Sequence, residues 1–393
     1  MHRIKLSIIL FLLVLQSKPL TAQFDNVHFE RTSIKHGLPN GYIREIFEDH
    51  FGFLWFGTRE GIFRYDGYEF KAFRHDVMDS TTLSHPNVNG ILEDGDDNIW
   101  VATSNGLNRL DRRTGKFKRY YPLSKEKATI KSDNHVRKIY LDRKDNLWLA
   151  WKRNLLRFDL ETEQFTTIYQ KGDSTADHFI RSFYEDREGT LWAGTTIGLL
   201  RLAEGDSSFQ YLLPDPEKDS DNNKYIASIC EDAEGALWMG TQGGLVHWNP
   251  ETKELKKDIL PPEWRNHPVN YVTTDSNHNV WLALELNGLG VFNTAQKHFY
   301  HYKHQPNENN SLNDDNVTRI LEDNFQNIWV ATHNGISKIR RDNSGFELIQ
   351  NKMGDVNSAN NVNRVMQDSR GVIWFKAQTG YYKLERGHSY GER

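Results

Sequence analysis

The stretch Glu185-Asp186-Arg187-Glu188-Gly189-Thr190-Leu191-Trp192-Ala193-Gly194-Thr195 combines a turn and a strand that recur throughout the 393-residue chain. Aligning the sequence on the pair of an aliphatic residue and Trp gives eight anchors, spaced 43 to 48 residues apart: Trp55, Trp100, Trp148, Trp192, Trp238, Trp281, Trp329 and Trp374. An Asp stands six residues before each anchor: Asp49, Asp94, Asp142, Asp186, Asp232, Asp275, Asp323 and Asp368. This period is typical of a propeller blade of four strands.

Each repeat predicts four short strands. The residues before the Asp, such as those at 42–48, are rich in β-formers and are expected to form the inner strand. Gly or Asn between the Asp and the Trp predicts a tight turn, the Trp strand comes second, and two more turns lead to a third strand and an outer fourth strand. We therefore predict an all-β protein, a β-propeller of four-stranded antiparallel blades. The Trp side chains should fill the space between blades, and the Asp side chains should cap the turns.

The number of blades in the ring stays open at this point. Residues 27–31 match an outer strand and precede the first inner strand, so they are expected to close the ring against its last blade. A ring of seven places them beside the Trp329 blade, and a ring of eight places them beside the Trp374 blade. We favour seven, with a signal peptide at 1–22, a propeller at 23–345 and an eighth repeat at 346–393 that begins a second propeller.

Composition and charge exclude several classes of protein. The 49 Lys and Arg against 53 Asp and Glu leave no basic surface, so nucleic acid is not an expected partner. Cys230 is the single cysteine, which excludes an intrachain disulfide and a Cys-rich metal site. Basic residues at 2–5, an apolar run at 6–15 and a small residue before Gln23 are typical of a signal peptide. We expect an exported protein, periplasmic or secreted, and anchored to a membrane only if the chain is part of a longer one.

The candidate ligand site is the face that carries the connections between fourth and first strands and between second and third strands. Four of its loops are long and polar, at 75–86, 123–133, 214–223 and 305–316. One polar position at the start of each inner strand is expected to surround the channel mouth: Arg44, Asn89, Arg137, Arg181, Ala227, Asn270, Thr318 and Asn363. Its three guanidinium groups suit a carboxylate or sulfate. The alternative is a hydrated channel whose charges are neutralised by neighbours such as Glu45.

Departures from the repeat supply further candidates on the same face. The turn of the third blade contains Trp151, and Trp264 lies in the loop before the sixth blade. Exposed aromatic rings can stack on sugars, so both are candidate platforms, with packing between blades as the alternative. The turn of the sixth blade is one residue longer than the others and offers Glu285 and Asn287 as polar contacts. Trp248 aligns with apolar positions on the third strands and is expected in the core.

The sequence gives no catalytic set, metal site or cofactor motif that we can assemble. His298, His301 and His304 lie on one expected strand, whose alternation sends them to different faces. An enzyme acting at the channel mouth remains the rival hypothesis, with His135 and His178 near the starts of inner strands as candidate bases.

The recurring Glu-Asp, aliphatic-Trp, Gly-Thr and Gly-Leu residues resemble the two-component regulator propeller repeat, over about residues 24–385. The resemblance implies the periplasmic sensor region of a hybrid two-component system, of the kind with which gut-type Bacteroidetes detect oligosaccharides. It implies an oligosaccharide or another polar small ligand, and as further partners the downstream propeller and kinase parts or a second copy of the chain. A kinase segment is not found here, so we expect a truncated sensor or a stand-alone propeller. Streptogramin lyase has a comparable ring of repeats, and a lyase of this kind is the alternative function.

Overall fold

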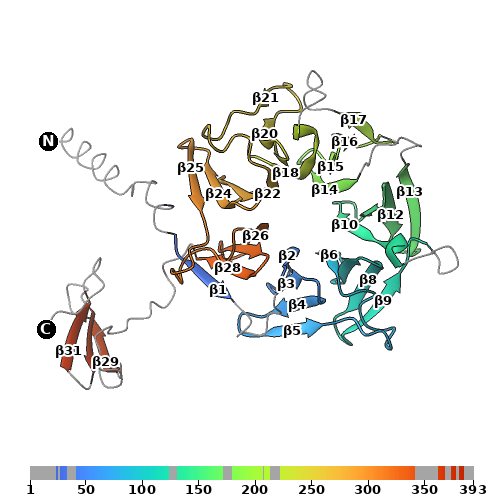
Figure 1. The fold of residues 1–393 in the computed structure, drawn as a ribbon. Helices are drawn as coiled ribbons and strands as arrows, with labels where there is room; N and C mark the ends of the chain where they lie inside the picture. The colour runs from blue at the N-terminus through green and yellow to red at the C-terminus, as the bar shows by residue number, and fades with distance from the viewer. Residues whose placement is uncertain are drawn as a thin grey trace, which may run out of the picture. The chain divides into compact units, whose positions relative to one another are not determined.

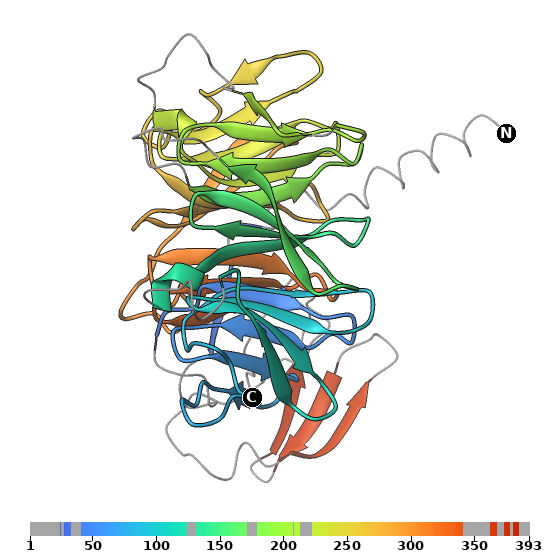
Figure 2. The same ribbon diagram turned by 90° about the vertical axis from the view of Figure 1, so that its right-hand side faces the viewer.

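The computed structural model describes residues 24, 27–32, 41–123, 131–170, 179–206, 208–212, 222–340, 362–367, 373–377 and 380–384. The chain divides into two compact units, Met1–Arg341 and Asp342–Arg393. The first unit is a ring of seven four-stranded antiparallel sheets, seen along its axis in Figure 1 and edge-on in Figure 2. Within the described ranges, no helix has the length and apolar character that crossing a membrane would require. The proposed signal peptide at 1–22 lies outside the described residues.

The blades follow one another along the chain, and each runs from an inner first strand to an outer fourth strand. The first strands are β2 (Glu45–Glu48), β6 (Val88–Glu93), β10 (Val136–Leu141), β14 (Ile180–Glu185), β18 (Ile226–Glu231), β22 (Val269–Thr274) and β26 (Val317–Glu322). The second strands are β3 (Leu54–Gly57), β7 (Ile99–Thr103), β11 (Leu147–Trp151), β15 (Leu191–Thr195), β19 (Leu237–Thr241), β23 (Val280–Leu284) and β27 (Ile328–Thr332).

The outer half of each blade completes the sheet. The third strands are β4 (Ile62–Tyr65), β8 (Gly106–Asp111), β12 (Asn154–Asp159), β16 (Leu199–Leu202), β20 (Gly244–Trp248), β24 (Gly288–Asn293) and β28 (Gly335–Ile339). The fourth strands are β5 (Phe70–Phe73), β9 (Lys116–Tyr120), β13 (Gln164–Gln170), β17 (Gln210–Leu212), β21 (Leu255–Lys256), β25 (His298–Tyr302) and, for blade 7, β1 (Phe29–Thr32). Short 3-10 helices, η3 (Lys131–Asn134) and η4 (Asn222–Lys224), precede the third and fifth blades.

The ring closes through its N-terminal strand, which confirms the seven-bladed arrangement. β1 pairs antiparallel with β28, from Phe29 opposite Ile339 to Thr32 opposite Ile336. The Phe29 side chain is buried in the same cluster as Ile339. Strands that are far apart in sequence thus form one blade, and closure removes the exposed edges that an open sheet would have.

The second unit forms a sheet of its own. It contains β29 (Val362–Gln367), β30 (Ile373–Ala377) and β31 (Gly380–Leu384), which pair in that order. The eighth anchor, Trp374, lies on β30, the second strand of this sheet. Asp368 and residues 346–349 lie outside the described residues. The eighth repeat therefore has a three-stranded core of the expected topology, and its role as the start of a second propeller stays a prediction.

The Trp and Asp of each repeat form one hydrogen-bonded unit. The seven anchor Trp side chains of the ring are at most 5% exposed, and each contributes to the cores between blades. Asp49 shows the pattern: Oδ1 accepts the N–H groups of Phe51 and Phe53, and Oδ2 accepts the indole N–H of Trp55 at 2.7 Å. The same indole bond recurs in five further blades at 2.6–2.8 Å. The Asp therefore caps the turn as predicted and also satisfies a buried indole donor.

Blade 5 departs from this pattern. Asp232 Oδ2 is 2.7 Å from Nε2 of His247 on β20, in the place where the other blades bind the indole N–H. Trp238 Nε1 is buried and has no hydrogen-bond partner. The His247 and Trp238 rings pack with their centroids 4.3 Å apart. The Trp remains a core residue here although its polar group is not satisfied.

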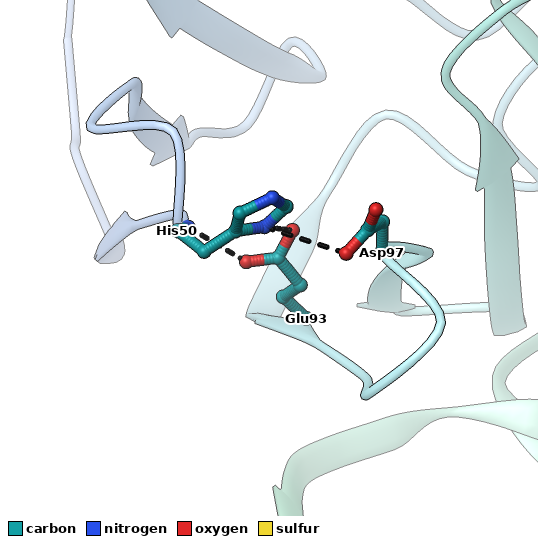
Figure 3. Close-up of side chains that lie close together, drawn as sticks. All are labelled: His50, Glu93 and Asp97. Carbon is teal, nitrogen blue, oxygen red and sulfur yellow. Dashed lines mark hydrogen bonds and ion pairs between the residues drawn. The ribbon is translucent and has the colours of Figure 1, made fainter.

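The Glu before the repeated Asp joins neighbouring blades. In five of the seven interfaces, the backbone N–H that follows the Asp of one blade donates to a Glu carboxylate of the next, at 2.6–3.0 Å: His50 to Glu93, Arg143 to Glu185, Arg187 to Glu231, Ser276 to Glu322 and Asn324 to Glu48. Figure 3 shows the first of these contacts, in which the His50 ring also lies 2.8 Å from Glu93 and 3.6 Å from Asp97. The Glu-Asp dipeptide thus serves two structural purposes at this end of the ring.

Candidate ligand site at the channel mouth

All seven blades contribute to one cavity of about 610 Å³ at the starts of the inner strands, which we call the channel pocket. Its volume lies in the range usual for small-molecule sites. The lining residues are Tyr42, Arg44, Asn89, His135, Arg137, Lys138, Arg181, Tyr225, Ala227, Gln242, Asn270, Glu285, Leu286, Asn316, Val317, Thr318, Arg319 and His333. All seven ring positions singled out in the first unit, from Arg44 to Thr318, are among them, whereas Asn363 lies on β29 in the second unit.

The three arginines of this set lie against aromatic rings. Arg137 on β10 lies over Phe179, with 4.7 Å between its guanidinium carbon and the ring centroid, and Arg181 on β14 lies over Tyr225 at 5.4 Å. Each therefore packs against the blade that follows its own. Arg44 lies over Tyr42 at 5.1 Å and donates to Asn89 Oδ1 at 2.7 Å. These contacts fix the guanidinium planes without neutralising their charge.

An ion-pair network crosses the channel beside these arginines. Glu45 of blade 1 binds Lys138 of blade 3 at 2.9 Å and Arg319 of blade 7 at 2.9 Å. Burial works to raise the pKa of Glu45, but Arg319 and Lys138 together hold that pKa below its usual value. Burial, and then the charge of Arg319, lower the pKa of Lys138 to about 8 although Glu45 opposes the shift. Glu45 therefore partly compensates the charges of Lys138 and Arg319.

His135 adds an uncharged hydrogen-bonding group to the pocket. Burial, together with the charges of Arg137 and Arg44, lowers the pKa of this imidazole to about 4. The ring is therefore neutral at pH 7, and it can offer one donor and one acceptor.

Sequence reasoning named His135 only as a candidate base and missed the other members of two rows of residues on either side of the predicted ring position. Tyr42, His135 and Tyr225 stand two residues before it, while Lys138 and Arg319 stand directly after it. A signal was available, because each row occupies one phase of the repeat. The second row is recognised only with the bulge near the start of six of the seven inner strands, as between Val136 and Lys138, which turns two successive side chains toward the channel.

The two candidate aromatic platforms do not line the pocket. Trp151 is 9% exposed, and its indole donates to the backbone oxygen of Asp133 at 2.8 Å, so the exposed-platform interpretation is wrong for this residue. Its large ring is held in the core between blades 2 and 3. Trp264 is half-buried and packs against His301 and His267, with centroid distances of 4.1 and 4.8 Å. It belongs to the outer side of blade 6.

The long turn of blade 6 divides between the pocket and the outer strand. Glu285 is exposed and lines the pocket beside Leu286. Asn287 turns away from it: its amide donates to the Glu285 backbone oxygen at 3.0 Å, and its own backbone oxygen lies 2.6 Å from His301 Nε2. His298, by contrast, packs against Tyr300, with ring centroids 4.5 Å apart. Trp248 is buried at 5% exposure, which confirms its place in the core.

Two of the four long loops are rigid connections. Arg119 on β9 binds the loop at 75–86 through the backbone oxygens of Asp79, Thr82 and Leu83. Arg31 on β1 binds the loop at 305–316 in the same way, through the oxygens of Glu308, Ser311 and Leu312. Of both loops only Asn316 lines the pocket. The loops at 123–133 and 214–223 lie largely outside the described residues.

One cluster with metal-ligating side chains occurs among the described residues, at the opposite end of the ring. His50, Glu93 and Asp97 bring one ligand atom each to within 4.8 Å of one another (Figure 3). The Arg112 guanidinium binds Glu93 and also pairs with Asp49 at 2.8 Å. Because a cation of the protein already compensates Glu93, the cluster is a contact between blades 1 and 2.

Comparisons with known proteins agree with this geometry. Five segments match the family model "Two component regulator propeller", at residues 37–60, 82–105, 175–196, 220–243 and 311–334. A stretch of 78 residues is 38% identical to histidine kinase P4 of Formosa agariphila and covers 20% of this chain and 6% of that protein. The chain therefore spans only a small part of this relative.

Solved structures extend the comparison to most of the chain. The extracellular domain of a putative hybrid two component system from B. thetaiotaomicron superposes with a TM-score of 0.68 at 25% identity, over 93% of this chain and 49% of that one. Another such domain from the same organism gives a TM-score of 0.67 at 22% identity, over 94% and 48%. Virginiamycin B lyase from Staphylococcus aureus shares the fold alone, at 12% identity and a TM-score of 0.60, over 80% and 99%. The chain is thus a seven-bladed β-propeller in which five segments match the two-component regulator propeller model, and it spans about half the length of the similar extracellular domains of hybrid two-component systems.

Proposed function

We propose that this propeller is the exported ligand-sensing part of a two-component system and that it binds an oligosaccharide or another polar small ligand in the channel pocket. The observation that carries the proposal is the excess of positive charge there. Arg44, Arg137 and Arg181 line the pocket and form no ion pair with any described residue, and Glu285 is the single acidic residue of the lining. Acidic oligosaccharides are therefore the first ligands to screen, and neutral ones the second.

The proposal is tested by calorimetry with a ligand selected on a glycan array. Arg137→Ala and Arg181→Ala should each weaken binding by about 1.5–3 kcal/mol, the range for hydrogen bonds to charged groups, with little change in unfolding temperature. Arg113→Ala is the matched control, because Arg113 follows β8 at the opposite end of the ring. Unchanged affinity in both pocket variants would move the site away from the channel mouth.

Export and signalling belong to the same proposal. The basic and apolar residues at 2–15 support cleavage before Gln23 and a periplasmic or secreted location. Similarity to extracellular domains of hybrid two-component systems supports a connection to further propeller and kinase parts, or to a second copy of the chain. Mass spectrometry of the exported protein should find an N-terminus near residue 23, and an intact Met1 in the cytoplasm would contradict export.

A second candidate function is catalysis at the channel mouth, since a lyase shares the fold and His135 lines the pocket. With a pKa of about 4, this imidazole is a weak general base at neutral pH, which favours binding over catalysis. His178 lies outside the described residues. Incubating the selected glycan with the protein and examining it by mass spectrometry separates the two functions, because a lyase releases products and a sensor returns the ligand intact.

A further inference from the structure

We infer that the channel pocket has two separate anion subsites, one formed by Arg137 and Arg181 and the other by Arg44 together with the exposed Arg59, which lies outside the pocket lining, and that it takes a ligand with two negatively charged groups joined by an uncharged, hydroxyl-bearing centre. The inference rests on the proposed function of the pocket and specifies the chemistry of its ligand.

The first subsite lies between blades 3 and 4. Arg137 and Arg181 come from neighbouring inner strands, and each is backed by the aromatic ring of the following blade. Burial lowers the pKa of Arg137, and the charge of Arg181 lowers it further. Arg137 Nε is buried without a hydrogen-bond partner. Two cations that repel each other and leave a buried donor unused are both stabilised when an anion binds between them.

The second subsite lies on blade 1. Arg44 and the exposed Arg59, in the turn between β3 and β4, both lie over the Tyr42 ring, at 5.1 and 4.6 Å. The His333 ring also packs against Tyr42, with 4.2 Å between the ring centroids. Burial and the charge of Arg59 lower the pKa of Arg44 although Tyr42 works against them. Arg44 Nε, like Arg137 Nε, is buried and unpartnered.

Neutral polar groups separate the two subsites. His135 lies near both Arg44 and Arg137, since both charges act on its titration. Asn89 of blade 2 accepts from Arg44 and donates to the Val136 backbone oxygen at 2.9 Å, which links blade 1 to blade 3. A ligand that reaches from one arginine pair to the other must therefore pass uncharged donors and acceptors, which suits hydroxyl groups.

The remaining cations of the pocket do not form a third subsite. Lys138 and Arg319 share the Glu45 carboxylate, so their charges are partly compensated within the protein. On blades 5 to 7, the ring position is occupied by the uncharged Ala227, Asn270 and Thr318. The two arginine pairs are thus the places where a carboxylate or sulfate gains most. A disaccharide with an acidic group on each sugar fits this arrangement.

The test uses inorganic sulfate as the probe and the side-chain Nε–Hε signals of the arginines as the readout. Titration with sodium sulfate, against sodium chloride at equal ionic strength, should shift the signals of both pairs with two distinct dissociation constants. Arg181→Gln should abolish the response of Arg137 alone, and Arg59→Gln that of Arg44 alone. Arg113→Gln is the control that should change neither. A single set of shifts, lost together in either variant, would overturn the inference, as would no response at any of the four arginines.

A second measurement separates this inference from the proposed function. Digalacturonate is compared with the same disaccharide in which one carboxylate is reduced to an alcohol, and we expect the loss of one charge to weaken binding about tenfold or more. Two sulfate sites without binding of any oligosaccharide on an array, acidic or neutral, would support the subsites and refute oligosaccharide sensing. Equal affinity for the two disaccharides would refute the requirement for two charges while leaving the sensing function in place.

Discussion

The two ends of the ring are built by opposite rules. At the turn end, six of the seven blades repeat the Asp–Trp hydrogen bond at 2.6–2.8 Å, and five of the seven interfaces repeat the Glu contact. At the pocket end, the position at the start of each inner strand carries Arg, Asn, Ala or Thr, depending on the blade. Every blade needs a capped turn and a filled space against its neighbour, and the turn end provides both. The pocket end has no such requirement in each blade, so its residues can differ around the ring. A residue present in every blade therefore indicates a role in stability, and under the proposed function a residue that departs from the repeat at the pocket is a candidate ligand contact.

The largest effect should come from the repeated end. Trp192 is 1% exposed and fills the space between blades 4 and 5, so Trp192→Ala should lower the free energy of unfolding by about 3–5 kcal/mol. Chemical denaturation measures this loss. Trp264→Ala is the control, because this half-buried ring lies on a loop and should cost clearly less. Equal losses of unfolding free energy in the two variants would show that the anchor Trp residues do not stabilise the ring more than other Trp residues do.

Blades 4 and 5 differ in the hydrogen bond between Asp and Trp, so comparing them tests how much this bond contributes to stability. Asp186 accepts two backbone N–H groups and the Trp192 indole, so Asp186→Ala leaves a buried donor unsatisfied and should cost about 2–3 kcal/mol. In Asp232→Ala, the indole of Trp238 loses nothing, because it has no partner in the native protein. We expect this variant to be the less destabilised by about 1 kcal/mol in the same denaturation experiment. The reverse order would mean that the His247–Asp232 pair stabilises blade 5 more than the indole bond stabilises the others.

The Glu between blades should have a smaller effect. Glu231 accepts the Arg187 backbone N–H at 3.0 Å and pairs with its guanidinium at 2.8 Å, so Glu231→Ala should cost about 1 kcal/mol. Glu254→Ala, which removes an exposed partner of Lys256 after β20, should change stability by less than about half of that. If the thermal unfolding curves of the two variants shift equally, the Glu of the repeat does not stabilise the contact between blades.

The smallest expected effect is a pH dependence at the pocket end. The pKa of Lys138 is about 8, so the amine loses its proton as the pH rises from 7 to 9. The pocket then loses one positive charge, and its affinity for an anionic ligand should fall by on the order of fivefold. Calorimetry at several pH values measures this fall. Lys138→Arg should remove it, since a guanidinium stays charged throughout this range, and a fall that persists in the variant would assign the titration to another group.

The periodicity of the sequence alone predicts most of the fold. The spacing of the eight Trp and eight Asp residues predicts the blades, the order of their strands and the capped turns, because those features depend on residues close together in the chain. The set from Arg44 to Thr318 could be placed at the channel for the same reason, since one phase of a repeat lies at one radius of the ring. The roles of Trp151 and Asn287 could not be read in this way, because turn residues of this kind point inward or outward according to their neighbours.

The sequence by itself determined that this protein is a propeller with one Trp and one Asp per blade and a polar channel mouth, since local turn chemistry and a fixed period suffice for that. Tertiary structure alone decided that the ring has seven blades, because closure depends on β1 pairing with β28 some 300 residues later. It also decided which charges remain uncompensated. Glu45 meets Lys138 and Arg319 across the ring, whereas Arg44, Arg137 and Arg181 form no ion pair with a described residue, and such long-range pairing depends on where the blades lie around the axis.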